Sequence, residues 1–193
     1  MNIKILQTGP IQTNTYILEG KNSLIVIDPG DEPQKIQQVA EAKGKPINFV
    51  LLTHAHWDHT GAVEFFQKKG AKVYLHKLDL EMTTKAPSIF GKVNPDVLFD
   101  KDETVMFDNI PIRVIHTPGH SQGSVCFETA ATIFSGDTLF RGEVGRCDLP
   151  SGNFTTLKKS LQKIFALAKN HTVYPGHGDK TSLDYEMKNN PYA

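Results

Sequence analysis

The segment HAHWDH, at residues 54–59, places three histidines and one aspartate within six positions. Imidazole and carboxylate groups are common metal ligands, and burying so many of them without partners would be costly. His54 and His56 are two positions apart, so on extended backbone their side chains point the same way and can reach one ion. Asp58 and His59 follow where the chain is expected to turn into a helix, and they can face a second ion. The segment therefore favours a metal site over a purely structural group of histidines.

Further histidine and aspartate residues follow apolar runs later in the chain, in the segments HTPGH at 116–120, GD at 136–137 and PGH at 175–177. Strands that share one core can end at one edge, which is where α/β folds bind ligands. The candidate ligands are therefore His54, His56, Asp58, His59, His116, His120, Asp137 and His177.

The number of candidates exceeds the four ligands that a single tetrahedral zinc ion takes. It suits two metal ions about 3.5–4 Å apart that share a bridging carboxylate and a water molecule. A structural zinc site is disfavoured, because such sites prefer cysteine and neither Cys126 nor Cys147 lies near the first segment. A metal-stabilised binding module without turnover is an alternative, although mixed nitrogen and oxygen ligands suit an open catalytic site better.

Short apolar runs separated by turn-forming residues predict the elements that must position these side chains. Strands are expected at 3–6, 13–18, 23–27, 48–52, 72–76, 104–107, 110–115, 124–128, 131–135 and 172–175. Helices are expected at 33–43, 60–69, 77–84 and 155–168, the last with Leu157, Leu161, Ile164, Phe165 and Ala168 on one face. This alternation predicts an α/β fold with sheets covered by helices. Segment 141–153 is expected to be a long loop, and such loops are often functional.

Length and composition predict one globular domain over residues 1–193. Hydrophobic residues make up 39% and charged residues 22% of the chain, which is ordinary for such a domain. The formal net charge is zero, which gives no electrostatic footprint for nucleic acid or an anionic membrane. No apolar run approaches the roughly 18 residues of a membrane span, and the N-terminus lacks the features of a signal peptide. With two cysteines, these features predict reduced thiols and a cytoplasmic location.

Five motifs are spread along nearly the whole chain: DPG at 28–30, HAHWDH at 54–59, TPGHS at 117–121, SGDTLF at 135–140 and PGHG at 175–178. Their order and spacing resemble those of the metallo-β-lactamase superfamily. The resemblance implies a four-layer αβ/βα sandwich, with a metal site at the edge between the two sheets.

The resemblance also implies how the ligands are divided between two divalent metal ions. One ion would be held by His54, His56 and His120, the other by Asp58, His59 and His177, with Asp137 as the bridge. Asp28 would lie near the cluster in a supporting role. His116 is left out, because the family's ligand is the second histidine of its pair, and His76 and His171 are expected to be structural or on the surface. Zinc is the expected metal, with iron or manganese as alternatives.

Within the superfamily, segment 136–153 most resembles the hydroxyacylglutathione hydrolases (glyoxalase II) and their short stand-alone bacterial relatives. Lactamases proper are secreted and typically carry cysteine at the position of Asp137, and di-iron oxygen reductases carry glutamate at the position of His56. The tRNA-processing and nuclease branches carry long inserts that 193 residues cannot hold. The resemblance implies hydrolysis of a small-molecule S-acyl thioester, in which Asp58 and Asp137 orient hydroxide and take its proton.

Arg146 lies at the loop position where glyoxalase II uses a lysine to hold a glutathione carboxylate, so we expect it to bind substrate. The alternative is an internal ion pair with Asp148 that only shapes the loop. The chain ends soon after His177, and the C-terminal helical domain of glyoxalase II is expected to be absent, which leaves glutathione specificity open. The alternative activity is that of a persulfide dioxygenase, which shares the histidine motif but binds a single iron.

Overall fold

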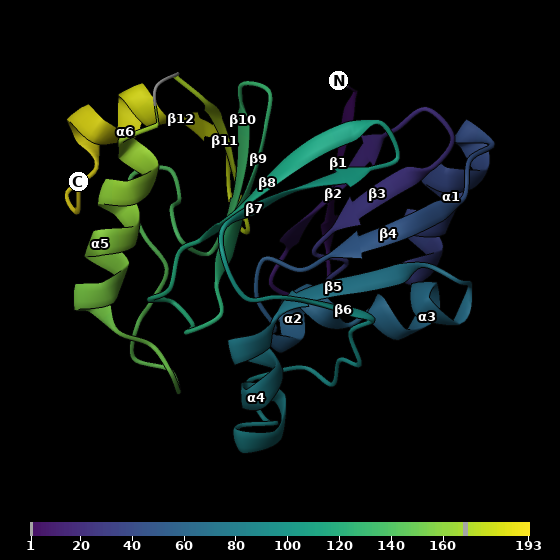
Figure 1. The fold of residues 1–193 in the computed structure, drawn as a ribbon, viewed down its shortest axis with the longest axis horizontal. Helices are drawn as coiled ribbons and strands as arrows, with labels where there is room; N and C mark the ends of the chain where they lie inside the picture. The colour runs from purple at the N-terminus through teal and green to yellow at the C-terminus, as the bar shows by residue number, and fades with distance from the viewer. Residues whose placement is uncertain (1, 168–169) are drawn as a thin grey trace.

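Two mixed six-stranded sheets lie face to face in a computed structural model that describes residues 2–167 and 170–193 (Figure 1). In the first sheet the strands lie side by side in chain order: β1 (Ile3–Thr8), β2 (Thr13–Glu19), β3 (Leu24–Ile27), β4 (Ile47–Leu51), β5 (Lys72–His76) and β6 (Val97–Phe99). In the second sheet the chain order also runs from one edge to the other: β7 (Glu103–Phe107), β8 (Ile110–His116), β9 (Val125–Thr129), β10 (Thr132–Gly136), β11 (Thr172–Pro175) and β12 (Thr181–Ser182).

Helices cover the outer faces of both sheets and complete four layers (Figure 1). The first sheet is covered by α1 (Pro33–Lys43) and α3 (Val63–Lys68). The second is covered by α5 (Phe154–Phe165) and α6 (Leu183–Asn189). The remaining short helices, α2 (Trp57–Thr60) and α4 (Lys77–Lys85), follow β4 and β5. This arrangement confirms the four-layer sandwich.

Local sequence accounts for the ends of the two longest helices. Helix α1 begins with Pro33, which the first turn tolerates because its missing N–H would be unpaired there, and ends at Gly44 in the left-handed conformation (φ 61°). Helix α5 begins after Asn153, whose side chain accepts a hydrogen bond from the N–H of Thr156. Because each cap satisfies backbone groups locally, the apolar face of the helix is free to pack.

Three clusters of buried side chains hold the layers together. One lies between the first sheet and its helices, one between the two sheets, and one between the second sheet and α5. The middle cluster contains Phe107, Phe127 and Phe134, all without solvent exposure. Burial of large apolar side chains on both faces of each sheet leaves the strand ends as the place for polar chemistry.

Strand direction brings the ends of four strands to one side. Strands β8 and β10 are both antiparallel to β9, and β11 is parallel to β10, so β8, β10 and β11 end at the same edge of the second sheet. In the first sheet β4 runs parallel to β3 and β5. The histidine and aspartate segments follow these four strands, as the sequence predicts.

The predicted elements differ from the observed ones in five places. The helix expected at 60–69 is two helices, α2 and α3, broken at Gly61, where an added Cβ would lie 2.3 Å from the carbonyl oxygen of Gly30. Strands β6 and β12 and helix α6 were not predicted, because short apolar runs carry little periodicity. Helix α5 ends at Phe165, and the expected position of Ala168 on its buried face lies outside the described residues.

No helix among residues 2–167 and 170–193 is long and apolar enough to cross a bilayer. Cys126 and Cys147 are both free thiols.

The packing of α5 on the second sheet can be tested at Leu161, which is 1% exposed in the third cluster. We expect Leu161→Ala to lower the free energy of unfolding by about 2–5 kcal/mol, because it removes buried methyl groups and leaves a cavity. Urea denaturation of the metal-free protein measures the loss. Gln162→Ala, at the exposed neighbouring position, should change it by less than about 0.5 kcal/mol; equal losses in the two variants would contradict this packing.

Candidate metal centre

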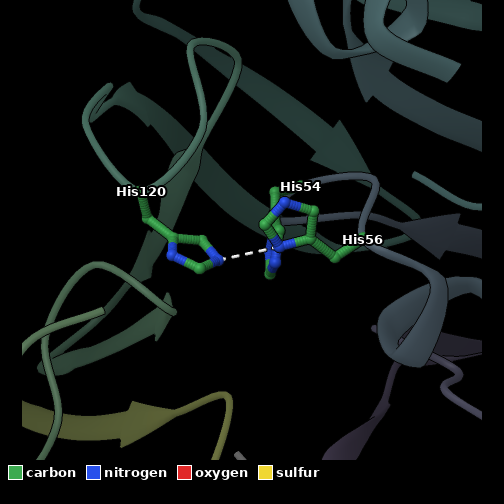
Figure 2. A group of neighbouring side chains, drawn as sticks. All are labelled: His54, His56 and His120. Atoms are coloured by element: carbon green, nitrogen blue, oxygen red, sulfur yellow. Dashed lines mark hydrogen bonds between the residues drawn. The ribbon is translucent and has the colours of Figure 1, made fainter. Parts of the chain in front are cut away.

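The candidate ligands converge where the two sheets meet. They form three groups, and within each group the ligand atoms lie within 4.8 Å of one another. The groups are His54, His56 and His120; Asp58, His59 and His177; and His54, His59 and Asp137. Figure 2 shows the first group, in which His120 approaches His54 and His56 from the opposite sheet, with His120 Nε2 2.9 Å from His56 Nδ1.

The Asp137 carboxylate faces both the first and the second group. Its Oδ1 lies 3.3 Å from His59 Nε2, and its Oδ2 lies 3.5 Å from His120 Nε2 and 3.7 Å from His177 Nε2. This is the position that a carboxylate shared by two ions requires.

Several atoms of the centre are buried without a hydrogen-bond partner: His54 Nε2, His56 Nε2, His59 Nε2 and Asp137 Oδ1. Polar atoms in this state are costly in a folded protein unless they bind a ligand. Imidazole nitrogens and a carboxylate oxygen are the donor atoms that divalent transition metals take. The donor set therefore fits metal ions.

In His54, His59 and His120 the Nδ1 atom is held by the protein, which aims Nε2 inward, whereas in His56 it is Nδ1 that lies toward His120. His59 Nδ1 lies 2.9 Å from Asp28 Oδ2, and His120 Nδ1 lies 2.7 Å from the carbonyl oxygen of Arg146. His54 Nδ1 lies 3.1 Å from Thr53 Oγ1. Partners of this kind fix the tautomer and the ring orientation of metal-binding histidines.

Asp28 lies behind the centre in the supporting role that the resemblance implies. Besides His59, it accepts hydrogen bonds from the Thr53 N–H (2.8 Å) and Thr53 Oγ1 (2.6 Å). Its φ of 50° is unusual for aspartate and turns the chain sharply at the end of β3. One buried carboxylate thus orients a ligand and the backbone that leads to His54.

Electrostatics favour a cation at this position. Burial, together with neighbouring histidines, lowers the pKa of His54, and lowers that of His56 to about 3, so both rings carry free lone pairs. Burial acts to raise the pKa of Asp137, but His59 and other histidines outweigh it and hold that pKa at about 2. Burial is likewise outweighed at Asp58, whose pKa is lowered by His177, His59 and Thr13. Burial acts to lower the pKa of His59 and of His177, but neighbouring carboxylates outweigh it and raise both, so these two rings would release a proton when they bind a metal. The centre therefore presents neutral imidazoles at His54 and His56 beside ionised carboxylates.

A cleft of about 530 Å³ opens above the centre. Its lining combines the metal-facing residues with apolar side chains: Ile11, His56, Trp57, Asp58, Ile89, His120, Asp137, Phe140, Val144, Arg146, Leu149 and His177. Arg146 is exposed on the rim and forms a bidentate ion pair with Asp148, at 2.7 and 2.6 Å. The internal pair considered from the sequence is therefore formed, on a residue that also borders the cleft.

A model of the family described as the metallo-beta-lactamase superfamily matches residues 8–177. The chain belongs to the metallo-beta-lactamase superfamily. Among curated relatives, the probable metallo-hydrolase YqgX of Bacillus subtilis is 35% identical, over 100% of this chain and 97% of that protein. The hydroxyacylglutathione hydrolase GloC of Haemophilus influenzae is 31% identical, over 100% of this chain and 98% of its own length.

Solved structures share the fold over nearly the whole chain. The BLEG-1 B3 metallo-beta-lactamase is 33% identical with a TM-score of 0.88, covering 99% of each chain. TTHA1623, in a di-iron-bound form, is 37% identical with a TM-score of 0.85, covering 98% of this chain and 100% of its own. Together with the clustered ligand atoms, these similarities make this member of the superfamily a metal-dependent hydrolase with a candidate binuclear site.

The three remaining histidines stay outside the superfamily's motif positions and outside the three ligand groups. His116 Nε2 lies 2.9 Å from the carbonyl oxygen of Gln122, and its ring stacks on His76 with centroids 4.2 Å apart. His171 is buried, with Nε2 2.8 Å from Glu128 Oε1. Each has a contact outside the ligand groups, which agrees with the structural role expected for His76 and His171 and with the exclusion of His116 from the ligands.

Asn14 and Asp79 are among the supporting residues that were not predicted from the sequence. Asn14, on β2, donates from Nδ2 to the carbonyl oxygens of Pro175 (3.0 Å) and Gly178 (2.9 Å), which fixes the segment that carries His177. Asparagine is unfavourable in strands, and that was the available signal. Asp79, at the start of α4, accepts from the backbone between His54 and His56, and nothing local distinguishes it from a surface aspartate.

The bridging position of Asp137 predicts an asymmetry between two substitutions. We expect Asp137→Ala to reduce bound metal from two ions per chain to fewer than one, because a single carboxylate faces both groups. His116→Ala should retain two ions, because its ring faces the carbonyl oxygen of Gln122. Elemental analysis after gel filtration, with protein purified without chelator, measures both. Metal loss in His116→Ala together with full retention in His120→Ala would show that the pair was assigned backwards.

Proposed function

We propose that this chain hydrolyses S-acyl thioesters of the hydroxyacylglutathione type. The observation that carries the proposal is the set of buried, unpartnered imidazole and carboxylate atoms at the floor of an open cleft. The proposed ligands of one ion are His54, His56 and His120, those of the other are Asp58, His59 and His177, and Asp137 is shared. The name of the 31% identical relative GloC supports the choice of substrate class.

When bound, two divalent ions would supply hydroxide at neutral pH and a Lewis acid for the carbonyl oxygen. The protein supplies position and proton acceptors. Asp58 Oδ2 accepts a hydrogen bond from Thr13 Oγ1 (2.9 Å) and lies 3.2 Å from His177 Nε2. With both carboxylates ionised, Asp58 and Asp137 can orient the attacking water and hold its proton while the thiolate leaves.

The cleft wall suits a small acyl group joined to a larger carrier. Ile11 and Trp57 are exposed at its mouth, and Phe140 and Leu149 line it further along. Apolar contacts of this kind can hold the acyl chain and exclude water, while polar groups beneath them orient the carbonyl. A nucleophile from the protein is not required, because the attacking group is water.

Zinc is the proposed metal, because it binds imidazole and carboxylate and readily accepts a departing thiolate as a ligand. Imidazole also suits other ions of this series. The 37% identical structure of TTHA1623 is a di-iron-bound form, which makes iron the second candidate.

The proposed function predicts that this protein cleaves a thioester in preference to a β-lactam or a persulfide. We expect zinc-loaded protein to cleave lactoyl-glutathione, because its carbonyl is electrophilic and its thiolate leaves readily. The assay compares this substrate with a penicillin and with glutathione persulfide, following thiol release, β-lactam absorbance and oxygen uptake. Penicillin cleavage alone would favour the activity in the name of the 33% identical BLEG-1 protein. Persulfide-dependent oxygen uptake by an iron-loaded protein, without thioester cleavage, would favour a mononuclear dioxygenase.

The Arg146–Asp148 pair predicts opposite effects on KM. If Arg146 leaves Asp148 to bind a carrier carboxylate, Arg146→Ala should raise KM roughly fivefold with little change in kcat, because an exposed ion pair contributes up to about 1 kcal/mol. Asp148→Asn should lower KM, because it frees the guanidinium. Arg141→Ala, which removes an exposed arginine paired with Asp179, is the matched control and should leave KM unchanged. Equal KM values in all four proteins would assign Arg146 to loop structure alone.

A further inference from the structure

Asp79 is a fully buried carboxylate that joins two ligand-bearing segments without touching a ligand ring. Its Oδ2 accepts hydrogen bonds from the Ala55 N–H (2.9 Å) and from Ser121 Oγ (2.9 Å), and its Oδ1 accepts from the Gly123 N–H (2.7 Å). Ala55 lies between His54 and His56, and Ser121 directly follows His120.

Further contacts join the start of α4 to the segment that carries His120. Gln122 Nε2 donates to the carbonyl oxygen of Leu78 (3.0 Å). The approach at Gly123 is close enough that an added Cβ would lie 2.5 Å from the Asp79 nitrogen and 2.6 Å from its Oδ1. The His116 ring, at the end of β8, stacks on His76, which precedes α4. Helix α4 is thus fitted to the segment that carries His120.

We infer that Asp79 is a positioning residue that sets the separation between the His54–His56 pair and His120. The pair comes from the first sheet and His120 from the second, so the three rings in Figure 2 meet only if their two segments are held at a fixed distance. Asp79 holds one oxygen toward each backbone N–H and so spans that distance. The inference rests on the proposed metal centre, and it is independent of the proposed substrate.

The second ligand group is held by different contacts. Asp28 orients His59, Thr13 donates to Asp58, and Asn14 fixes the carbonyl groups on either side of His177. None of these contacts involves Asp79. Loss of Asp79 should therefore weaken the ion at His54, His56 and His120, and spare the other.

Asparagine at position 79 tests this role with almost no change of volume. Its side chain has one acceptor oxygen and one NH₂ donor. If the NH₂ group takes the place of Oδ1 it faces the Gly123 N–H, and if it takes the place of Oδ2 it faces the Ala55 N–H. Either orientation sets two donors against each other, so the spacing between the segments must change.

The experiment measures Zn²⁺ stoichiometry and affinity by competition with a chromophoric chelator, alongside thermal unfolding. Wild type should bind two ions, and Asp79→Asn should hold one tightly and the other about 10–100-fold more weakly, the range typical for partners behind metal ligands. Gly123→Ala, which leaves Asp79 intact but adds the crowded Cβ, should give the same result. If Asp79→Asn does not fold, the metal binding of Gly123→Ala tests the inference instead.

Two backgrounds assign the weakened ion. In His177→Ala, where the three-histidine group stays complete, adding Asp79→Asn should still weaken the remaining ion 10–100-fold. In His120→Ala, where that group is already broken, it should have no effect on the remaining ion. These readouts respond to ligand placement rather than to overall stability.

Glu186→Gln is the matched control. Glu186 is also fully buried and accepts from the Gly142 N–H (2.9 Å), Thr181 Oγ1 and Asn190 Nδ2, but it serves no segment within the three-histidine group. The Glu186→Gln variant should be less thermally stable than wild type and should still bind both ions. Unchanged binding of two ions in Asp79→Asn, or equal weakening of both, would overturn the inference. Fewer than two ions in wild type would instead refute the proposed binuclear centre.

Discussion

The structure depends on keeping ligand atoms buried and unpaired at the junction of two sheets. Polar atoms in that state destabilise a folded protein unless something compensates for their lost hydration. Here His54 Nε2 and His59 Nε2 are buried without a hydrogen-bond partner, while the Nδ1 atom of each ring is held by the protein. Metal binding would relieve this cost, so occupancy of the centre and stability of the fold should be coupled.

The contacts behind the ligands also join the two halves of the molecule. Asn14 and Tyr16, on the first sheet, hydrogen-bond to the carbonyl oxygen of Pro175 on the second. Asp79, from the helix after β5, reaches the segment after β8. The apolar cluster between the sheets sets the distance between them. These directional hydrogen bonds fix how the two sheets are placed relative to each other at the edge where the ligands lie. The packing of the two sheets therefore also determines the geometry of the site.

Chemistry and specificity reside in different layers of the site. The floor of the cleft is formed by imidazole and carboxylate groups on short segments directly after strands, which limits their movement. The rim is formed by exposed side chains: Trp57 at the start of α2, and Ile11 and the Arg146–Asp148 pair on loops. A change in the rim can alter which substrate is accepted without disturbing the floor, and the same fold can thus serve several hydrolytic activities.

Sequence alone determined the fold class, most strand positions and the identity of the clustered histidines and aspartates, because ligand spacing in HAHWDH and apolar periodicity are local properties. It also separated His120 from His116 through the family motif. The same motifs gave Asp137 as the bridge, and its carboxylate lies near both ligand groups in the structure. Only the tertiary structure decided that Arg146 pairs with Asp148, and that Asp79 and Asn14 support the centre. A single buried carboxylate or amide has no periodicity, and its role comes from backbone groups far away in the chain. Such partners are chosen by how the two sheets pack, which no local pattern records.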